Sequence, residues 1–186
     1  INPATLTVKT EGAKRAYNGK PLTAEGTITG FVNGETAKFT VTGSQTTVGQ
    51  SQNTYNIDWK AKDTTAKKGN YTISEDLGDL VVTQFAEKIT VTTTGGKFTY
   101  DGNAHGATVA VTGLPAGYTV ETATSDATAT DVTEKAVKAE CDHLVIKDDQ
   151  GKDVTSELNV DYKAGTIQIN PATLTVKTEG AKRAYN

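Results

Sequence analysis

Short stretches of alternating hydrophobic and polar residues run along the chain, and turn-forming residues separate them. In the stretch ATLTVKT at residues 4–10, Leu6 and Val8 share one face, and the residues on either side of them, including Lys9, share the other. Alternation over about four to eight residues, bounded by Gly, Asn or Asp, is typical of half-buried β-strands. The pattern therefore predicts an all-β chain of short strands.

Two dipeptides mark tight turns after the first strands of each half of the chain. Asn18-Gly19 and Asp101-Gly102 both follow a tyrosine, and their residue types tolerate a positive φ angle. We expect each dipeptide to close a turn at the end of a strand.

A third alternating stretch contains Tyr55, Ile57 and Trp59. In the second half we align Val137, Ala139 and Cys141 with these three residues, which places Cys141 where Trp59 lies. The stretch around Val137 also contains Ala, Glu and Lys, which favour helix. Because its counterpart favours strand, we predict strand for both.

The opening of the chain is repeated. The eighteen letters INPATLTVKTEGAKRAYN at residues 1–18 return unaltered at residues 169–186, and a fainter copy, KITVTTTGGKFTYDG, occupies residues 88–102. Ile89 follows Leu6 by 83 positions, and Tyr100 follows Tyr17 by the same number. Repetition at a fixed interval is the signature of a tandem array of structural units.

The repeats predict the domain organisation. We expect one unit at residues 1–84, a second at 85–168, and at 169–186 a linker with the first strand of a third, truncated unit. The chain starts at Ile1 and has no Met, so we interpret it as a slice of a longer array. An orphaned first strand leaves its hydrophobic face unpaired, so we expect Leu174 and Val176 to be buried by sheet pairing or strand exchange.

Charge and composition exclude several classes of protein. The chain has 19 basic and 22 acidic residues, and it lacks the dense basic face that nucleic-acid binding requires. No apolar run approaches the roughly 20 residues that span a bilayer, so we expect no direct membrane insertion. The single cysteine excludes an internal disulfide.

Four features together resemble a known family. They are the alternating first strand, the Tyr-Asn-Gly or Tyr-Asp-Gly turn, the Thr-Gly-Phe or Thr-Gly-Leu segment, and the final GTIQI strand that runs through Asn-Pro-Ala into the next unit. The chain resembles the MBG/YDG-type repeats found in tandem in bacterial cell-surface adhesins. The resemblance implies two tandem Ig-like β-sandwich-type domains in an elongated arrangement, extracellular on a cell-wall-anchored or secreted protein.

Candidate catalytic and metal-binding residues are few. His105 and His143 have no counterpart in the first unit, so we interpret them as surface or hydrogen-bonded structural histidines and expect no enzyme. Asp148, Asp149 and Asp153 surround Gly151 as in a calcium loop, but the twelve-residue pattern and its closing Glu are absent, which favours a polar hairpin turn. We expect no catalytic, cofactor-binding or metal-binding residues.

Three further residue types admit a functional and a structural interpretation. Cys141 is either a reactive nucleophile or a buried, inert thiol, and its strand position favours the second. Lys9 is either a partner in an intramolecular crosslink to Asn or Asp or a solvated strand lysine, and the alternation favours solvent. The tyrosines that precede the turns, Tyr17, Tyr100 and Tyr185, either form a binding stripe or pack beside the turns, and we favour packing.

The repeats indicate a mechanical function. We predict structural stalk repeats of a bacterial surface adhesin, which project a distal binding domain from the cell and have neighbouring repeats as their partners. The alternative is that the repeats themselves bind weakly and multivalently to host glycan, mucin, a host surface protein or another cell.

Overall fold

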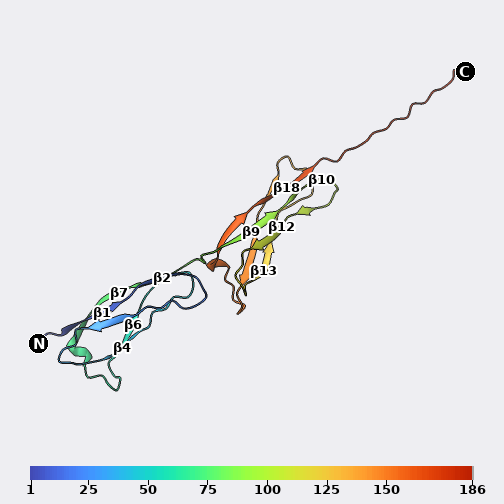
Figure 1. Cartoon of the computed structure of the whole chain (residues 1–186). Coiled ribbons are helices and arrows are strands. Elements are labelled where there is room, and N and C mark those ends of the chain that lie inside the picture. The colour runs from blue at the N-terminus through green and yellow to red at the C-terminus, as the bar shows by residue number, and fades with distance from the viewer. Residues whose placement is uncertain (186) are drawn as a thin grey trace. The chain divides into compact units, whose positions relative to one another are not determined.

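The computed structural model describes residues 1–185, and it is all-β (Figure 1). Strands contain 47% of the residues, and the described range has no α-helix, only two short 3₁₀ turns. The prediction of an all-β chain is confirmed. Its strands form several small sheets, none of which closes into a barrel.

The chain divides into two compact units. The first comprises residues 1–88 together with 154–159, and the second comprises residues 89–153 and those from 160 onward. Each unit is described by itself.

Eight short strands build the first unit. They are β1 (Ala4–Thr10), β2 (Ala13–Ala16), β3 (Gly26–Thr29), β4 (Lys38–Val41), β5 (Gly49–Gln52), β6 (Tyr55–Asp58), β7 (Tyr71–Leu77) and β8 (Asp79–Thr83), with the 3₁₀ turn η1 (Lys68–Asn70) before β7. They form three sheets, in the orders β3-β1-β7, β2-β8-β5 and β4-β6.

Strand β1 is the centre of the first unit. It pairs antiparallel with β3 and, along all seven residues, parallel with β7. Leu6 and Val8 have no exposed surface, whereas Lys9 is exposed, as the alternation predicts. Leu6 forms a hydrophobic cluster with Ala66 and Tyr71, against which Trp59 packs.

The remaining strands belong mainly to the second unit. They are β9 (Lys88–Thr94), β10 (Gly96–Thr99), β11 (His105–Gly106), β12 (Thr108–Thr112), β13 (Thr119–Thr124), β14 (Thr128–Ala129), β15 (Val137–Ala139), β16 (His143–Lys147), β17 (Asn159–Lys163) and β18 (Gly165–Asn170), and the 3₁₀ turn η2 (Thr155–Glu157) precedes β17. The sheet orders are β12-β9-β17, β10-β18-β15, β13-β16 and β11-β14.

The two halves of the sequence share their strand pairing. Val8 lies opposite Ile28 in the β1–β3 pair, and Val91 lies opposite Val111 in the β9–β12 pair. Both residues of the second pair follow their counterparts by 83 positions. Strands β2 and β8 are parallel, as are β10 and β18. The internal repeat in the sequence is therefore also a repeat of strand pairing.

The alignment of Val137, Ala139 and Cys141 with Tyr55, Ile57 and Trp59 is wrong. Val137 pairs with Ile167 of β18. The counterpart of Ile167 in the first unit is Leu80 of β8, and Leu80 pairs with Ser51. Val137 therefore occupies the place of Ser51. Ile167 follows Leu80 by 87 positions, whereas residues at the start of the repeat follow their counterparts by 83. The second repeat is therefore four residues longer than the first between these points. The prediction of strand around Val137 is confirmed.

Both predicted turns are present and have the same geometry. Gly19 has φ 75° and Gly102 has φ 77°. The Asn18 side-chain oxygen accepts a hydrogen bond from Lys20 N–H at 3.0 Å, and the Asp101 carboxylate accepts one from Asn103 N–H at 2.9 Å. A side-chain oxygen that binds the N–H two residues later stabilises such a turn, and Asn and Asp serve equally.

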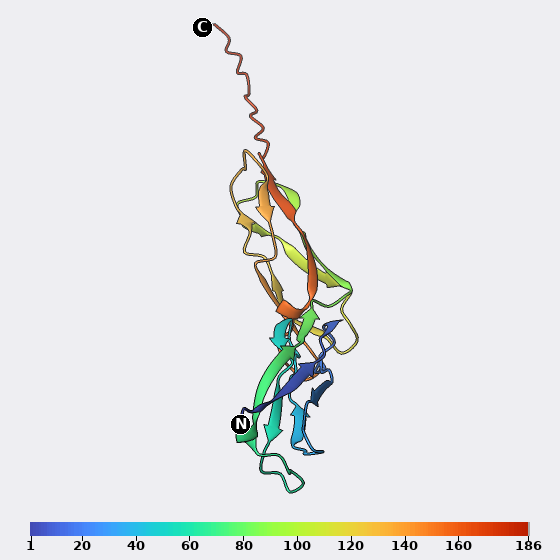
Figure 2. The ribbon, with the colours of Figure 1, turned by 90° about the vertical axis from the view of Figure 1, so that its left-hand side faces the viewer.

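The prediction that Leu174 and Val176 are buried is wrong. Residues 171–185 form no strand, and they leave the end of β18 as an extended segment (Figures 1 and 2). Leu174 is 91% exposed and Val176 85%, whereas Leu6 and Val8 in the identical sequence are fully buried. In the first unit β3 and β7 pair with β1 and bury it, whereas residues 171–185 pair with no strand in the part of the chain that the structure describes.

The identical sequences provide a matched test of burial. Leu6→Ala should lower the free energy of unfolding of the first unit by about 2–5 kcal/mol, because it leaves a cavity beneath β1. Leu174→Ala, which changes the same letter in the same context, should change it by less than about 0.5 kcal/mol. Trp59, the single tryptophan, packs on the Leu6 cluster, so its fluorescence during urea unfolding measures this unit. Equal effects of the two substitutions would contradict the assignment.

Candidate functional site

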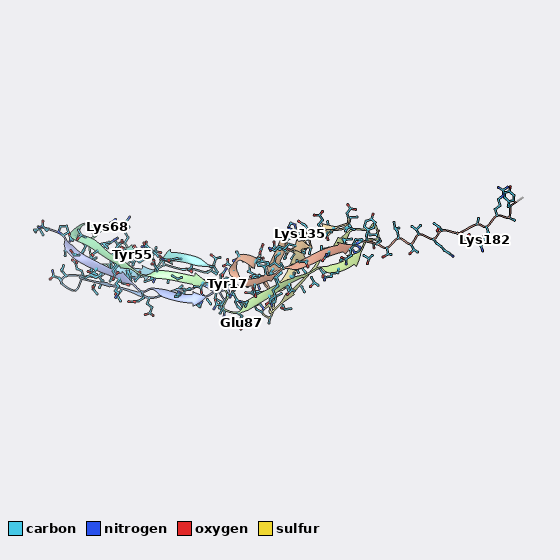
Figure 3. All side chains as sticks on the ribbon, turned by 90° about the horizontal axis from the view of Figure 1, so that it is seen from above. Tyr17, Tyr55, Lys68, Glu87, Lys135 and Lys182 are labelled. Carbon is cyan, nitrogen blue, oxygen red and sulfur yellow. The ribbon has the colours of Figure 1, made fainter. Side chains whose placement is uncertain are left out.

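The strongest candidate site is an open groove in the first unit, between β6 and β7. It has a volume of about 340 Å³. Its lining combines aromatic, aliphatic and charged side chains: Thr54, Tyr55, Asn56, Ile57, Trp59, Lys68, Ile73, Glu75 and Leu77. Tyr55 and Lys68 are labelled in Figure 3. We call this feature the β6–β7 groove.

The groove is open because both strands are at the edge of their sheets. Within residues 1–185, β7 pairs only with β1, and β6 pairs only with β4. Ile73 of β7 is consequently 41% exposed although it is a large apolar residue. An unpaired edge next to a second unpaired edge leaves room for side chains and for a ligand between them.

Tyr55 and Glu75 join the two sides of the groove. The Tyr55 hydroxyl donates a hydrogen bond to the Glu75 carboxylate. Partial burial, followed by this bond to Glu75, raises the pKa of Tyr55 to about 12. The phenol is therefore a neutral donor at any physiological pH, and it orients one carboxylate oxygen while the rest of the carboxylate is exposed.

Trp59 belongs to a cluster of three aromatic side chains. Its ring stacks on Tyr71, with centroids 6.3 Å apart and an interplanar angle of 26°, and Phe31 meets Tyr71 edge-on at 5.5 Å. The Tyr71 hydroxyl donates to Glu35 Oε2 at 2.6 Å and accepts from Val32 N–H at 3.2 Å. The hydrogen bond to Glu35 is the main cause that raises the pKa of Tyr71. These contacts hold the indole in place.

The groove has the chemistry of a binding site for a polar ring. An indole and a phenol offer flat apolar surface, and a carboxylate, an amide and an ammonium group offer hydrogen bonds. Its lining residues include neither histidine nor cysteine.

A larger hollow of about 650 Å³ lies between β3 and β4 in the same unit. Its lining comes mainly from small residues such as Thr23, Ala24 and Gly43, with Phe39 as its one aromatic side chain. Besides backbone and hydroxyl groups it offers one carboxylate, Glu25, and no indole, amide or ammonium group, so the β6–β7 groove is the better candidate.

Both histidine rings are hydrogen bonded to carboxylates, which agrees with their interpretation as surface or hydrogen-bonded structural histidines. His105 Nε2 lies 3.0 Å from Asp101 Oδ1, and its ring stacks on Phe98 with centroids 4.0 Å apart. His143 Nε2 lies 2.9 Å from Asp126 Oδ2 on the surface. Each histidine ring therefore has a different carboxylate partner.

The aspartates around Gly151 form a hairpin turn, as predicted. Gly151 has φ 77°, and the Asp148 carboxylate accepts hydrogen bonds from Gln150 N–H and Lys152 N–H, both at 2.9 Å. That carboxylate is therefore engaged by the backbone of its own turn. Residues 1–185 contain no cluster of three or more His, Cys, Asp or Glu side chains suited to a metal ion.

The prediction that Cys141 is a buried strand residue is wrong. Cys141 precedes β16 and is only partly buried, and its thiol donates a 3.5 Å hydrogen bond to His143 O. It lies in a connection because β15 already ends at Ala139. Burial is the main cause that raises the pKa of the Cys141 thiol, which opposes the reactive thiolate form.

The three turn tyrosines do not form a uniform stripe. Tyr17 is 2% exposed, Tyr100 is 42% exposed and Tyr185 is fully exposed. The Tyr17 hydroxyl lies 3.9 Å from the position that a Cβ atom would take at Gly19, so this ring packs beside its turn as predicted. Burial of the tyrosine therefore depends on its surroundings and not on the motif.

Sequence reasoning did not find the β6–β7 groove. The alternation of Tyr55, Ile57 and Trp59 indicates one side of it. Lys68 and Glu75 come later in the chain, and the fold brings them to the same groove as Tyr55.

The Asp101 turn predicts a pH dependence of stability. The Asn103 backbone N–H, then the Asn103 side chain and His105, lower the pKa of Asp101 to about 2. The unfolded value is about 3.9. The unfolded chain binds the proton more readily, so the stabilisation is fully present above about pH 4 and is lost as the pH falls toward 2. A carboxyl-carbon NMR titration should show a midpoint near 2.

Asn18, which makes the same turn without a titratable group, gives the matched control. Asp101→Asn should retain the turn and remove this part of the acid sensitivity of the second unit. An Asp101 midpoint near the unfolded value would contradict the hydrogen bonds at the turn.

No helix in residues 1–185 is both long and apolar enough to cross a membrane. Comparison with protein-family models, curated proteins and solved structures finds no match to this chain. The resemblance to MBG/YDG-type repeats therefore stays a prediction, carried by the motifs of the chain itself.

Proposed function

We propose that the two repeats are spacer modules of a bacterial surface adhesin, each an Ig-like β-sandwich, that project a distal binding domain from the cell. The observation that carries the proposal is the repetition of one strand-pairing scheme along a single chain, followed by a verbatim restart of the sequence. A protein that repeats a whole structural unit gains length with each copy.

The connections between repeats support this proposal. Strand β8 ends at Thr83 and β9 begins at Lys88, so four residues, Gln84 to Glu87, join them. The next connection is Asn170-Pro171-Ala172, in which proline fixes φ and lacks a backbone donor. Neither contains the Gly/Ser run of a flexible linker. Short connections of this kind favour a rigid array of repeats over a flexible one.

The histidines, the Asp148 turn and Cys141 each make hydrogen bonds to residues near them. We infer that the neighbouring repeats are the main partners, and that the parent protein is wall-anchored or secreted.

The β6–β7 groove favours a second candidate function. Its aromatic and charged lining suits a sugar ring, which stacks an apolar face on an indole and directs hydroxyl groups to a carboxylate. The groove belongs to the first repeat, so an array with near-identical alternate repeats would present it in every second unit. Many weak sites of this kind reach useful avidity together.

Scattering tests the spacer role. We expect the maximum dimension from small-angle X-ray scattering to grow in proportion to repeat number across proteins of two, four and six repeats. A flexible chain of modules would instead grow about as the square root of that number. Square-root growth would contradict the spacer role.

A glycan array with a four-repeat protein tests the second candidate. Binding should fall at least about tenfold in Glu75→Gln, a loss of about 1.4 kcal/mol per groove that removes the charge and retains the shape. Glu121→Gln, in the second unit, is the matched control, because Glu121 is a partly exposed carboxylate whose bond is to Lys147. Equal loss in both variants, or no binding by the native protein, would reject the groove as a glycan site and leave the spacer role standing.

A further inference from the structure

A short segment of the second repeat belongs to the compact body of the first unit. Residues 154–159 lie between β16 and β17 in the sequence, yet they group with residues 1–88. The segment contains the 3₁₀ turn η2, and its residues Val154, Glu157 and Leu158 are at most 7% exposed. The first unit is therefore built from two stretches of chain, and the second stretch comes from the repeat that follows.

Glu157 attaches this segment through two hydrogen bonds. Its carboxylate oxygen Oε2 accepts one from the Val48 backbone N–H at 2.6 Å, and its backbone carbonyl accepts one from the Phe85 N–H at 2.8 Å. Within residues 1–185, Glu157 is the only charged side chain that is buried. Burial of a carboxylate is costly unless hydrogen bonds compensate for it. The bond to Val48 offsets part of that cost and fixes the carboxylate in this position.

The Val48 N–H gains an acceptor from this contact. Val48 directly precedes β5, which pairs with β8 from Gly49 to Gln52 and is the outer strand of the sheet β2-β8-β5. The Val48 N–H lies before the start of that register, and its hydrogen bond to Glu157 is part-buried. A backbone N–H that is removed from water destabilises the fold unless it finds an acceptor. Glu157 therefore completes the hydrogen bonding of the first unit at the start of β5.

The equivalent segment of the first repeat has a different sequence and a different environment. Lys68 and Thr155 begin η1 and η2 and are 87 positions apart, the same offset as between Leu80 and Ile167. Lys67 and Asn70 are therefore the counterparts of Val154 and Glu157, and both are exposed. The 3₁₀ turn itself does not require burial, so the buried valine and carboxylate are specific to the attachment of residues 154–159.

We propose that residues 154–159 are a clasp through which the second repeat stabilises the first, so that the stability of the first unit depends on the repeat that follows it. The Glu157–Val48 hydrogen bond is the polar part of this clasp. Coupling between nearest neighbours makes repeats unfold together instead of one at a time. The coupling goes beyond the proposed function, because it holds for a spacer array and for a ligand-binding array alike.

Unfolding and hydrogen exchange of the intact chain test the clasp. Glu157→Ala removes the acceptor and leaves the Val48 N–H unsatisfied, so the equilibrium constant for unfolding of the first unit should rise about tenfold. Trp59, the single tryptophan, packs in this unit and reports its unfolding by fluorescence in urea. The exchange rate of the Val48 amide, followed by NMR, should rise at least about tenfold.

Two further substitutions separate the hydrogen bond from other effects. Glu157→Gln retains a side-chain oxygen that accepts from Val48, so most of the slow exchange should be retained. Glu121→Ala removes a carboxylate of the second unit that pairs with Lys147, and the Trp59 transition should not change. An unchanged Trp59 transition in Glu157→Ala, or an equal shift in Glu157→Ala and Glu121→Ala, would overturn the proposal.

A cavity in the second unit tests the coupling without a change to the clasp, and it also decides the case in which Glu157→Ala does not fold. Ile167 is fully buried in a cluster with Ala139 and Ile169, so Ile167→Ala should destabilise the second unit. Its unfolding can be followed by the NMR signal of the His105 ring. If the clasp couples the units, the Trp59 midpoint in urea should fall together with that of His105. A Trp59 midpoint that stays at its original value would overturn the proposal.

Discussion

Each unit depends on a central strand that is buried between two partner strands, one near to it in the sequence and one distant. β1 pairs with β3, which follows closely, and with β7, whose residues come 67 positions later. β2 likewise meets β8 at a separation of 67. Closing a loop of that size costs entropy before any contact compensates for it. The first strands therefore gain their burial only when the last strands of the unit are in place.

The same arrangement creates the β6–β7 groove. β7 pairs on one side with the central strand and has a free edge on the other. A free edge invites pairing with another chain, and charged side chains discourage it. Glu75 and Asp76 provide that charge on β7, and Glu75 also binds Tyr55 across the groove. The Glu75 carboxylate thus discourages pairing at the free edge of β7 and also lines the candidate binding site.

Sequence reasoning succeeds where structure is decided locally and fails where distant pairing decides it. The alternation of β1 and the turns at Gly19 and Gly102 depend on neighbouring residues, and they were predictable. The register of Val137 depends on β18, some 30 residues later, so spacing alone placed it wrongly. The groove is lined by residues from two separate stretches, 54–59 and 68–77, so neither stretch alone indicates it.

The two copies of one sequence give the clearest case of this limit. Leu6 and Leu174 have identical neighbours for several residues on both sides, yet one is fully buried and the other almost fully exposed. No property of the local sequence distinguishes them, so burial here is a property of the partners. It follows that the alternation of a repeated strand decides which of its faces is available for burial, and that the strands pairing with it decide whether that face is buried.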